Sequence, residues 1–184
     1  MDPRIARTRR SLQEALLELA RERELDGISV ADVAERAGVN RSSFYQHYAD
    51  KETLLADALD AVAEEAGADL PTLIETTAEP PHVLVAYLEH LDANAALYRR
   101  VLGEHGSAVA VARLRSRLQD VVLEGIARSG AAGFYADLPR DVVAAGVAGS
   151  VLGVLSVWIA MEPRPAPATA ASWLWRVLLG PDAR

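Results

Sequence analysis

The sequence predicts an all-α protein, with a three-helix N-terminal segment followed by a larger helical domain. Apolar residues recur every three or four positions along most of the 184 residues, which places them on one face of a helix. No Asn-Gly or Asp-Gly turn joins two alternating apolar runs, the usual signal of a β-hairpin. The chain has no Cys and is 51% hydrophobic, so we expect a packed core without disulfides.

Helix-breaking residues divide this periodic pattern into about nine helices. The breaks lie at Gly67 to Pro81, at Gly130 to Pro139 and at Pro163 to Pro167. We expect helices over 4–24, 30–37, from Asn40 onward, 50–66, 81–93, 95–103, 107–129, 140–161 and 168–179.

Residues 29–51 carry the clearest local signals. Ser29, with Asp32 three positions later, indicates a capping box at the start of a helix. Gly38 suits the end of that helix, where a left-handed backbone is needed. Asn40 and Asp50 are expected to cap the next two helices.

Phe44 and Tyr48, four residues apart, should anchor the third helix to the core. Its opposite face is polar, with Arg41, Tyr45 and Gln46. Two short helices joined by a tight turn form a helix-turn-helix, in which the second helix enters the DNA major groove.

The residue types on this segment suit DNA. Arg41 can donate to guanine or phosphate, the amide and hydroxyl side chains are adaptable partners for bases, and Tyr45 and His47 can donate to phosphates. Free N–H groups at the helix starts near Ser29 and Lys51 add sites for anions. We expect DNA contacts from Ser29, Asn40, Arg41, Ser42, Ser43, Tyr45, Gln46, His47 and Lys51.

The charge distribution permits this role although the whole chain has a net charge of −7. Residues 1–51 are neutral overall, so residues 52–184 carry the entire imbalance. Four Arg residues lie between positions 4 and 10, opposed only by Asp2. Such a cluster suits a phosphate backbone, but a solvated helix start is the simpler interpretation.

The run from Val39 to Tyr48, followed by Asp50-Lys51-Glu52-Thr53-Leu54-Leu55, resembles the TetR family of bacterial transcriptional regulators. It is similar to the branch that carries R-x-T-F-Y-x-H-F at this place, with Ser43 at the usual Thr and Tyr48 at the usual Phe. The resemblance is specific over about residues 8–60 and weaker beyond. It implies a dimer, a ligand-binding C-terminal domain, and DNA contacts from matching positions of the recognition segment.

Val142 to Met161 is a run of twenty residues without a charged side chain, long enough for a membrane span. Its many Ala, Gly and Ser residues argue against that alternative, as does the absence of a Lys/Arg cluster or an aromatic belt properly placed at its ends. A helix that is apolar all round must be buried all round. We expect its bulky stripe (Val147, Val151, Val154, Trp158) and its small-residue stripe to divide between the subunit's own core and a second copy. The resemblance implies a four-helix dimer interface, for which we name Gly146, Gly149, Gly153, Ser156, Trp173, Leu174 and Val177.

Polar and aromatic residues within the C-terminal helices are candidates to line a ligand pocket, although single Tyr and His residues are more often structural. The candidates are Tyr87, His90, Asn94, Tyr98 and Trp158.

Nothing in the sequence favours an enzyme. Glu79-Pro80-Pro81-His82 has the E-x-x-H spacing of helical di-metal sites, but its two prolines break the helix that such a site needs. No phosphate-binding loop or nucleophile elbow is present, and no metal or cofactor is expected. The N-terminus lacks a signal-peptide pattern, so we expect a cytoplasmic protein.

We therefore expect residues 1–50 to bind DNA and residues 51–184 to bind a small molecule and a second subunit. The sequence predicts a homodimeric transcriptional regulator that acts as a repressor. It binds a palindromic operator and is released from it by a ligand. The alternatives are a regulator without ligand response and a helical protein-interaction module.

Overall fold

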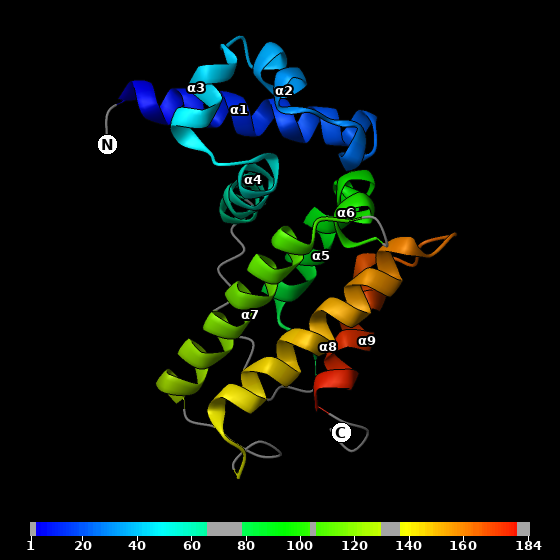
Figure 1. Ribbon diagram of the computed structural model, residues 1–184. Coiled ribbons are helices and arrows are strands. Elements are labelled where there is room, and N and C mark those ends of the chain that lie inside the picture. The colour runs from blue at the N-terminus through cyan, green and yellow to red at the C-terminus, as the bar shows by residue number, and fades with distance from the viewer. Residues whose placement is uncertain (1–2, 66–78, 104–105, 130–136, 180–184) are drawn as a thin grey trace. The chain divides into compact units, whose positions relative to one another are not determined.

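A computed structural model describes residues 3–65, 79–103, 106–129 and 137–179, and every regular element within them is a helix (Figure 1). The α-helices are α1 (Pro3–Glu22), α2 (Val30–Arg36), α3 (Arg41–His47), α4 (Lys51–Glu65), α5 (His82–Ala93), α6 (Ala95–Leu102), α7 (Ala108–Ser129), α8 (Arg140–Ala160) and α9 (Pro167–Leu179). A 3-10 turn, η1 (Leu25–Gly27), lies between α1 and α2. The all-α prediction is confirmed, and each expected helix is present within the described residues.

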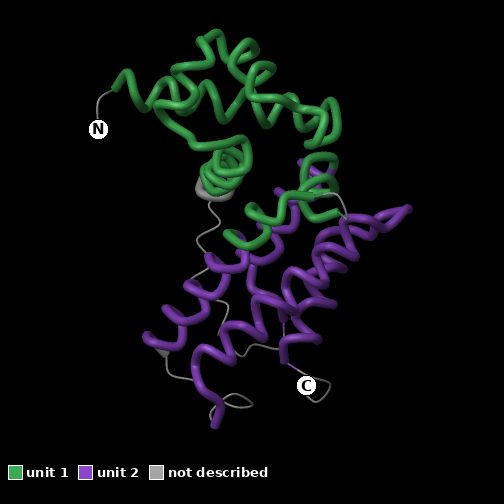
Figure 2. Tube along the Cα trace, in the orientation of Figure 1, with its two compact units in different colours: residues 1–63, 96–113 green, residues 64–95, 114–184 purple. Residues whose placement is uncertain are grey.

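The chain divides into two compact units (Figure 2). The first unit is formed within residues 1–63 and 96–113, and the second within residues 64–95 and 114–184. The first unit therefore combines α1 to α3 and most of α4 with most of α6 and residues 108–113 of α7. The expected division of function at residue 50 is not tested by this packing and stays a prediction.

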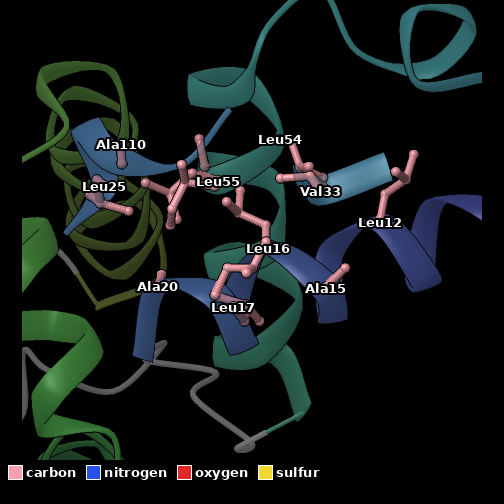
Figure 3. Packing of buried hydrophobic residues seen from close by; sticks show 14 of the residues in the cluster. Leu12, Ala15, Leu16, Leu17, Ala20, Leu25, Val33, Leu54, Leu55 and Ala110 are labelled. Carbon is pink, nitrogen blue, oxygen red and sulfur yellow. The ribbon is translucent and has the colours of Figure 1, made fainter. Parts of the chain in front are cut away.

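The core of the first unit supports the helix-turn-helix. Leu12 and Leu16 of α1 are fully buried, and they meet Val33 of α2 and Leu54 and Leu55 of α4 (Figure 3). Each buried aliphatic side chain contributes roughly 1.5–3 kcal/mol of transfer free energy. This packing stabilises α2 and α3, which with seven residues each are too short to be stable alone.

The second unit has its own packing. Helices α5 and α8 each pack on α9, and Val122 and Ile126 of α7 pack against Val143 and Ala144 of α8. Among the described helices, α8 alone is long and apolar enough to cross a membrane, and half of its most apolar stretch is buried inside the chain. A core helix passes the same test, so this result is weak support for a membrane span.

Candidate nucleic-acid interface

The first helix of the motif, α2, begins with the predicted capping box. The Ser29 hydroxyl accepts a hydrogen bond from the backbone N–H of Asp32 at 3.2 Å, and the Asp32 carboxylate accepts one from the backbone N–H of Ser29 at 2.7 Å. The Ser29 hydroxyl, the Ser29 backbone N–H and the Arg23 guanidinium together lower the pKa of Asp32 to about 2. The start of α2 is thus held by two reciprocal bonds, and the Asp32 carboxylate that accepts one of them stays ionised at neutral pH.

The turn between α2 and α3 is a complete Schellman motif. Gly38 has φ +68°, a left-handed conformation that a residue with a Cβ rarely adopts. The N–H of Val39 donates to the Ala34 carbonyl at 2.9 Å, and the N–H of Gly38 donates to the Glu35 carbonyl at 3.1 Å. These two bonds satisfy the last carbonyls of α2 and reverse the chain into α3.

The recognition helix α3 has two distinct faces. Phe44 is fully buried and Tyr48, its C-cap residue, is 3% exposed, so both aromatic anchors are confirmed. On the other face Arg41, Tyr45 and Gln46 are exposed, Tyr45 by 50%. The guanidinium of Arg41 lies 5.7 Å from the centre of the Tyr45 ring, so these two polar side chains are already held together on the exposed face.

Several of the predicted DNA-contacting side chains also serve as caps. The Asn40 side chain accepts a hydrogen bond from the backbone N–H of Ser43 at 2.7 Å and another from the Ser42 hydroxyl at 2.6 Å. Ser43 and His47 are half-buried, while Asn40 and Ser42 are exposed. The predicted contacts of Asn40, Ser42, Ser43 and His47 with DNA stay predictions.

Lys51 lies at the start of α4, whose predicted cap is confirmed by the bond from the Thr53 N–H to the Asp50 carboxylate at 2.7 Å. The Lys51 ammonium donates to the backbone carbonyls of Leu25 and Ile28. It therefore ties α4 to the segment that leads into α2, which sequence alone did not indicate. An ammonium has three donors, so this structural role leaves the predicted phosphate contact as a prediction.

Sequence reasoning missed a polar cluster behind α3. One carboxylate oxygen of Asp57 in α4 accepts hydrogen bonds from the Tyr48 hydroxyl, from Arg9 and from Gln13, at 2.5, 2.8 and 2.7 Å. Burial raises the pKa of Asp57, but these three donors outweigh it and lower the pKa below its ordinary value. No local signal could have found the cluster, because Arg9 and Asp57 are 48 positions apart.

The five proposed ligand-binding residues are divided between the two compact units. Tyr98 lies in the first unit, whereas Tyr87, His90, Asn94 and Trp158 lie in the second. Tyr87, Tyr98 and Trp158 are buried. The Trp158 indole N–H donates to the Pro165 carbonyl at 2.9 Å, and the Asn94 amide donates to the His90 carbonyl at 3.0 Å. The ligand site stays a prediction.

The residues expected to meet a second copy are mostly exposed. The small-residue stripe of α8 faces outward at Gly146, Gly149 and Gly153, whereas Val151 and Trp158 of the bulky stripe face the core. Trp173 and Val177 of α9 are also exposed, and Ser156 is half-buried.

Leu174 differs from these residues. It is fully buried inside its own chain, so it contributes to the subunit's core, and we leave it out of the proposed interface.

An apolar hollow of about 460 Å³ lies on this face of α8 and α9. It is lined by Ser150, Gly153, Val154, Val157, Trp158, Met161, Trp173 and Val177.

Within the described part of the chain, no group of three or more His, Cys, Asp or Glu residues is placed to hold a metal ion. Glu79 of the E-x-x-H string lies before α5, and His82 is the first residue of that helix.

Residues 12–58 match the family model described as "Bacterial regulatory proteins, tetR family". The chain is 43% identical over 56 residues, 30% of its length, to the uncharacterized HTH-type transcriptional regulator YxbF of Bacillus subtilis. It is 32% identical over 104 residues, 53% of its length, to the HTH-type transcriptional regulator EthR of Mycobacterium tuberculosis. These matches span 15% of YxbF and 48% of EthR.

Solved structures share the fold over nearly the whole chain. A TetR transcriptional regulator from Streptococcus agalactiae matches with a TM-score of 0.65 and 24% identity, covering 96% of each chain. FadR of Thermus thermophilus, solved in complex with lauroyl-CoA, matches with a TM-score of 0.60 and 21% identity, covering 93% of each chain. The capping box, the Schellman turn, the two-faced helix and the family match together identify residues 12–58 as a TetR-type N-terminal domain, carried by a chain with the all-helical fold of solved TetR regulators.

Proposed function

We propose that this protein is a cytoplasmic transcriptional regulator that binds a palindromic operator as a homodimer. The observation that carries the proposal is the exposed face of α3. Arg41, Tyr45 and Gln46 point to solvent while Phe44 and Tyr48 anchor the helix from behind. A helix supported in this way can enter a major groove with its polar face toward the bases.

The start of α1 supports additional phosphate contacts. No acidic residue lies in its first turn, and Arg4, Arg7 and Arg10 are exposed within the first eight residues of the helix. Positive charge at a helix N-terminus is unfavourable by itself, because the helix dipole is also positive there. A nearby phosphate backbone would offset that repulsion, and it would make binding sensitive to salt.

The exposed face of α8 and α9 supports a homodimer. Val157 and Val177 are 60% and 56% exposed, next to the outward-facing glycines of α8 and the apolar hollow of about 460 Å³. Two copies joined there would bury apolar surface and would present two copies of α3 to two half-sites. A single α3 offers only a few base contacts, each worth ~1–3 kcal/mol, so the second copy supplies needed specificity.

We further propose repression that a small molecule relieves by binding the second unit, with Tyr87, His90, Asn94 and Trp158 as the candidate contacts. Such an effector lowers operator affinity by the coupling free energy between the two sites, typically ~1–3 kcal/mol. FadR was solved with lauroyl-CoA, and RolR, whose structure matches this fold with a TM-score of 0.61, was solved with resorcinol. Both compounds are ligands of those proteins. They are suitable first compounds for a screen.

The test is selection of bound duplexes from a random-sequence DNA pool, followed by affinity measurements over a salt series. The expected result is a palindromic site whose affinity falls steeply with salt. Arg41→Ala and Tyr45→Ala should each lower that affinity about tenfold or more. Arg128→Ala is the matched control, because it removes an exposed Arg of α7 in the second unit and should leave affinity unchanged.

Two outcomes would contradict the proposal. Failure of the folded wild-type protein to enrich any duplex would favour a protein-interaction module. Equal affinities of the Arg41→Ala and Arg128→Ala variants would show that α3 does not read the DNA. A specific site that no tested compound releases would favour a regulator without ligand response.

A further inference from the structure

The polar cluster behind α3 brings together Arg9 and Gln13 of α1, Tyr48 at the end of α3 and Asp57 of α4. The Tyr48 hydroxyl donates to Asp57 at 2.5 Å and accepts a bond from the Arg9 guanidinium at 3.3 Å. Arg9 also donates to Asp57 at 2.8 Å and lies 5.3 Å from the centre of the Tyr48 ring. The hydroxyl is therefore held from both sides, as donor and as acceptor.

Tyr48 is well placed to control the orientation of α3. It is the C-cap residue of that seven-residue helix, and its N–H donates to the Phe44 carbonyl at 3.0 Å. The apolar contacts of Phe44 and of the Tyr48 ring hold α3 against the core, but hydrophobic attraction has no preferred direction. A hydrogen bond to a carboxylate is directional and stronger than a neutral one.

The protonation states favour this bond at neutral pH. The Asp57 pKa is lowered despite burial, so its carboxylate is ionised and acts only as an acceptor. Burial and the neighbouring Asp57 raise the pKa of Tyr48 to about 12, so its hydroxyl keeps the proton that it donates.

We propose that Tyr48 is a positioning residue for DNA recognition: its hydroxyl, bonded to Asp57 and Arg9, sets the rotation of α3 that presents Arg41 and Tyr45 to the operator. The residue itself does not touch the DNA. This inference rests on the proposed DNA-binding function. It assigns a role in DNA recognition to a buried side chain, which is not part of the exposed face of α3.

The test compares two variants that each remove one hydrogen bond to the same oxygen of Asp57. Tyr48→Phe removes the bond from the end of α3 to Asp57, together with the longer 3.3 Å bond that Arg9 donates to the same hydroxyl, and keeps the aromatic ring in the core. Gln13→Ala removes one of the two bonds from α1, keeps the bond from Arg9, and leaves α3 untouched. Operator affinity is measured at a series of salt concentrations, at a temperature well below the melting temperatures of both variants. Those melting temperatures are determined in parallel.

We expect both variants to fold with similar small losses of thermal stability. Tyr48→Phe should lower operator affinity roughly tenfold, equivalent to about 1.4 kcal/mol, with an unchanged salt slope. Gln13→Ala should stay within about twofold of the wild type. A merely structural role would affect the melting temperatures of both variants alike and would not separate their operator affinities.

A mutant cycle tests whether Tyr48 acts through Asp57. In an Asp57→Ala background, the added Tyr48→Phe change should lower operator affinity no further. If Asp57→Ala does not fold, the comparison of Tyr48→Phe with Gln13→Ala decides the question alone.

Three results would overturn the inference. Wild-type affinity in Tyr48→Phe would show that the hydroxyl does not position α3. A salt slope reduced by about one phosphate contact in that variant would show that the hydroxyl binds DNA directly. No DNA binding by the wild type would overturn the proposed function together with this inference.

Discussion

The Gly38 turn allows the backbone requirement of the helix-turn-helix to be measured separately from packing. Gly38 has φ +68°, and a Cβ added there would meet no atom within 4 Å. Gly38→Ala therefore changes backbone conformational energy without a steric clash. Gly27 in η1 is a matched control, because a Cβ there also meets nothing within 4 Å and its φ is not positive.

The expected effects of the two substitutions have opposite signs. A left-handed backbone destabilises a residue with a Cβ by ~1–2 kcal/mol, and Ala reduces the entropy of the unfolded chain by an equivalent of ~0.4–1 kcal/mol. Gly38→Ala should therefore lower the free energy of unfolding by about 1 kcal/mol, a fall of about 2–4 °C in melting temperature for a chain of this size. Gly27→Ala carries only the second term and should be neutral or slightly stabilising.

The assay is urea unfolding followed by far-UV circular dichroism, at one protein concentration because self-association shifts the midpoint. Gly38→Asn should fall between the wild type and Gly38→Ala, since Asn tolerates the left-handed region better than Ala. Equal stability of Gly38→Ala and Gly27→Ala would refute the reasoning. It would mean that the turn adopts another conformation, or that strain at position 38 is relieved elsewhere.

Two further perturbations follow from the structure. The pKa of Asp32 is lowered from its ordinary value of 3.8 to about 2 in the folded chain. The ionised carboxylate therefore contributes fully to the free energy of unfolding above pH 3.8, and this contribution is lost as the pH falls toward 2. Asp32→Asn should make acid unfolding by circular dichroism less steep in that window, and an unaltered acid limb would contradict the capping role. Val157→Asp should place a charge in the proposed dimer face and yield monomers in sedimentation velocity, whereas Val109→Asp, at a valine 48% exposed in α7, should leave the dimer intact. Monomeric wild-type protein, or an unaffected Val157→Asp dimer, would exclude that face.

The sequence by itself determined the helices and the local geometry of the motif. The capping box at Ser29, the turn at Gly38 and the cap at Asn40 all depend on residues within five positions of one another. Such local bonds can be read from the sequence because their partners are close along the chain, although the core must hold the two short helices in place. The aromatic anchor of α3 was readable for the same reason, since residues four positions apart, such as Phe44 and Tyr48, lie on the same side of a helix.

Only the tertiary structure decided which distant groups meet. The sequence suggested Lys51 as a contact for an anion such as a DNA phosphate. In the structure its ammonium donates hydrogen bonds to backbone carbonyls 26 and 23 positions earlier in the chain. The uncharged stretch of α8 that begins at Val142 gave no sign of which stripe faces inward, because both stripes lack charge and either one can be buried. Packing against the other helices of the second unit placed Val151 and Trp158 in the core and left the glycines outside. The bond from Tyr48 to Asp57 is likewise a contact that only the tertiary structure reveals. α4 offers more than one carboxylate, and the choice among them depends on how α1, α3 and α4 pack rather than on spacing along the chain.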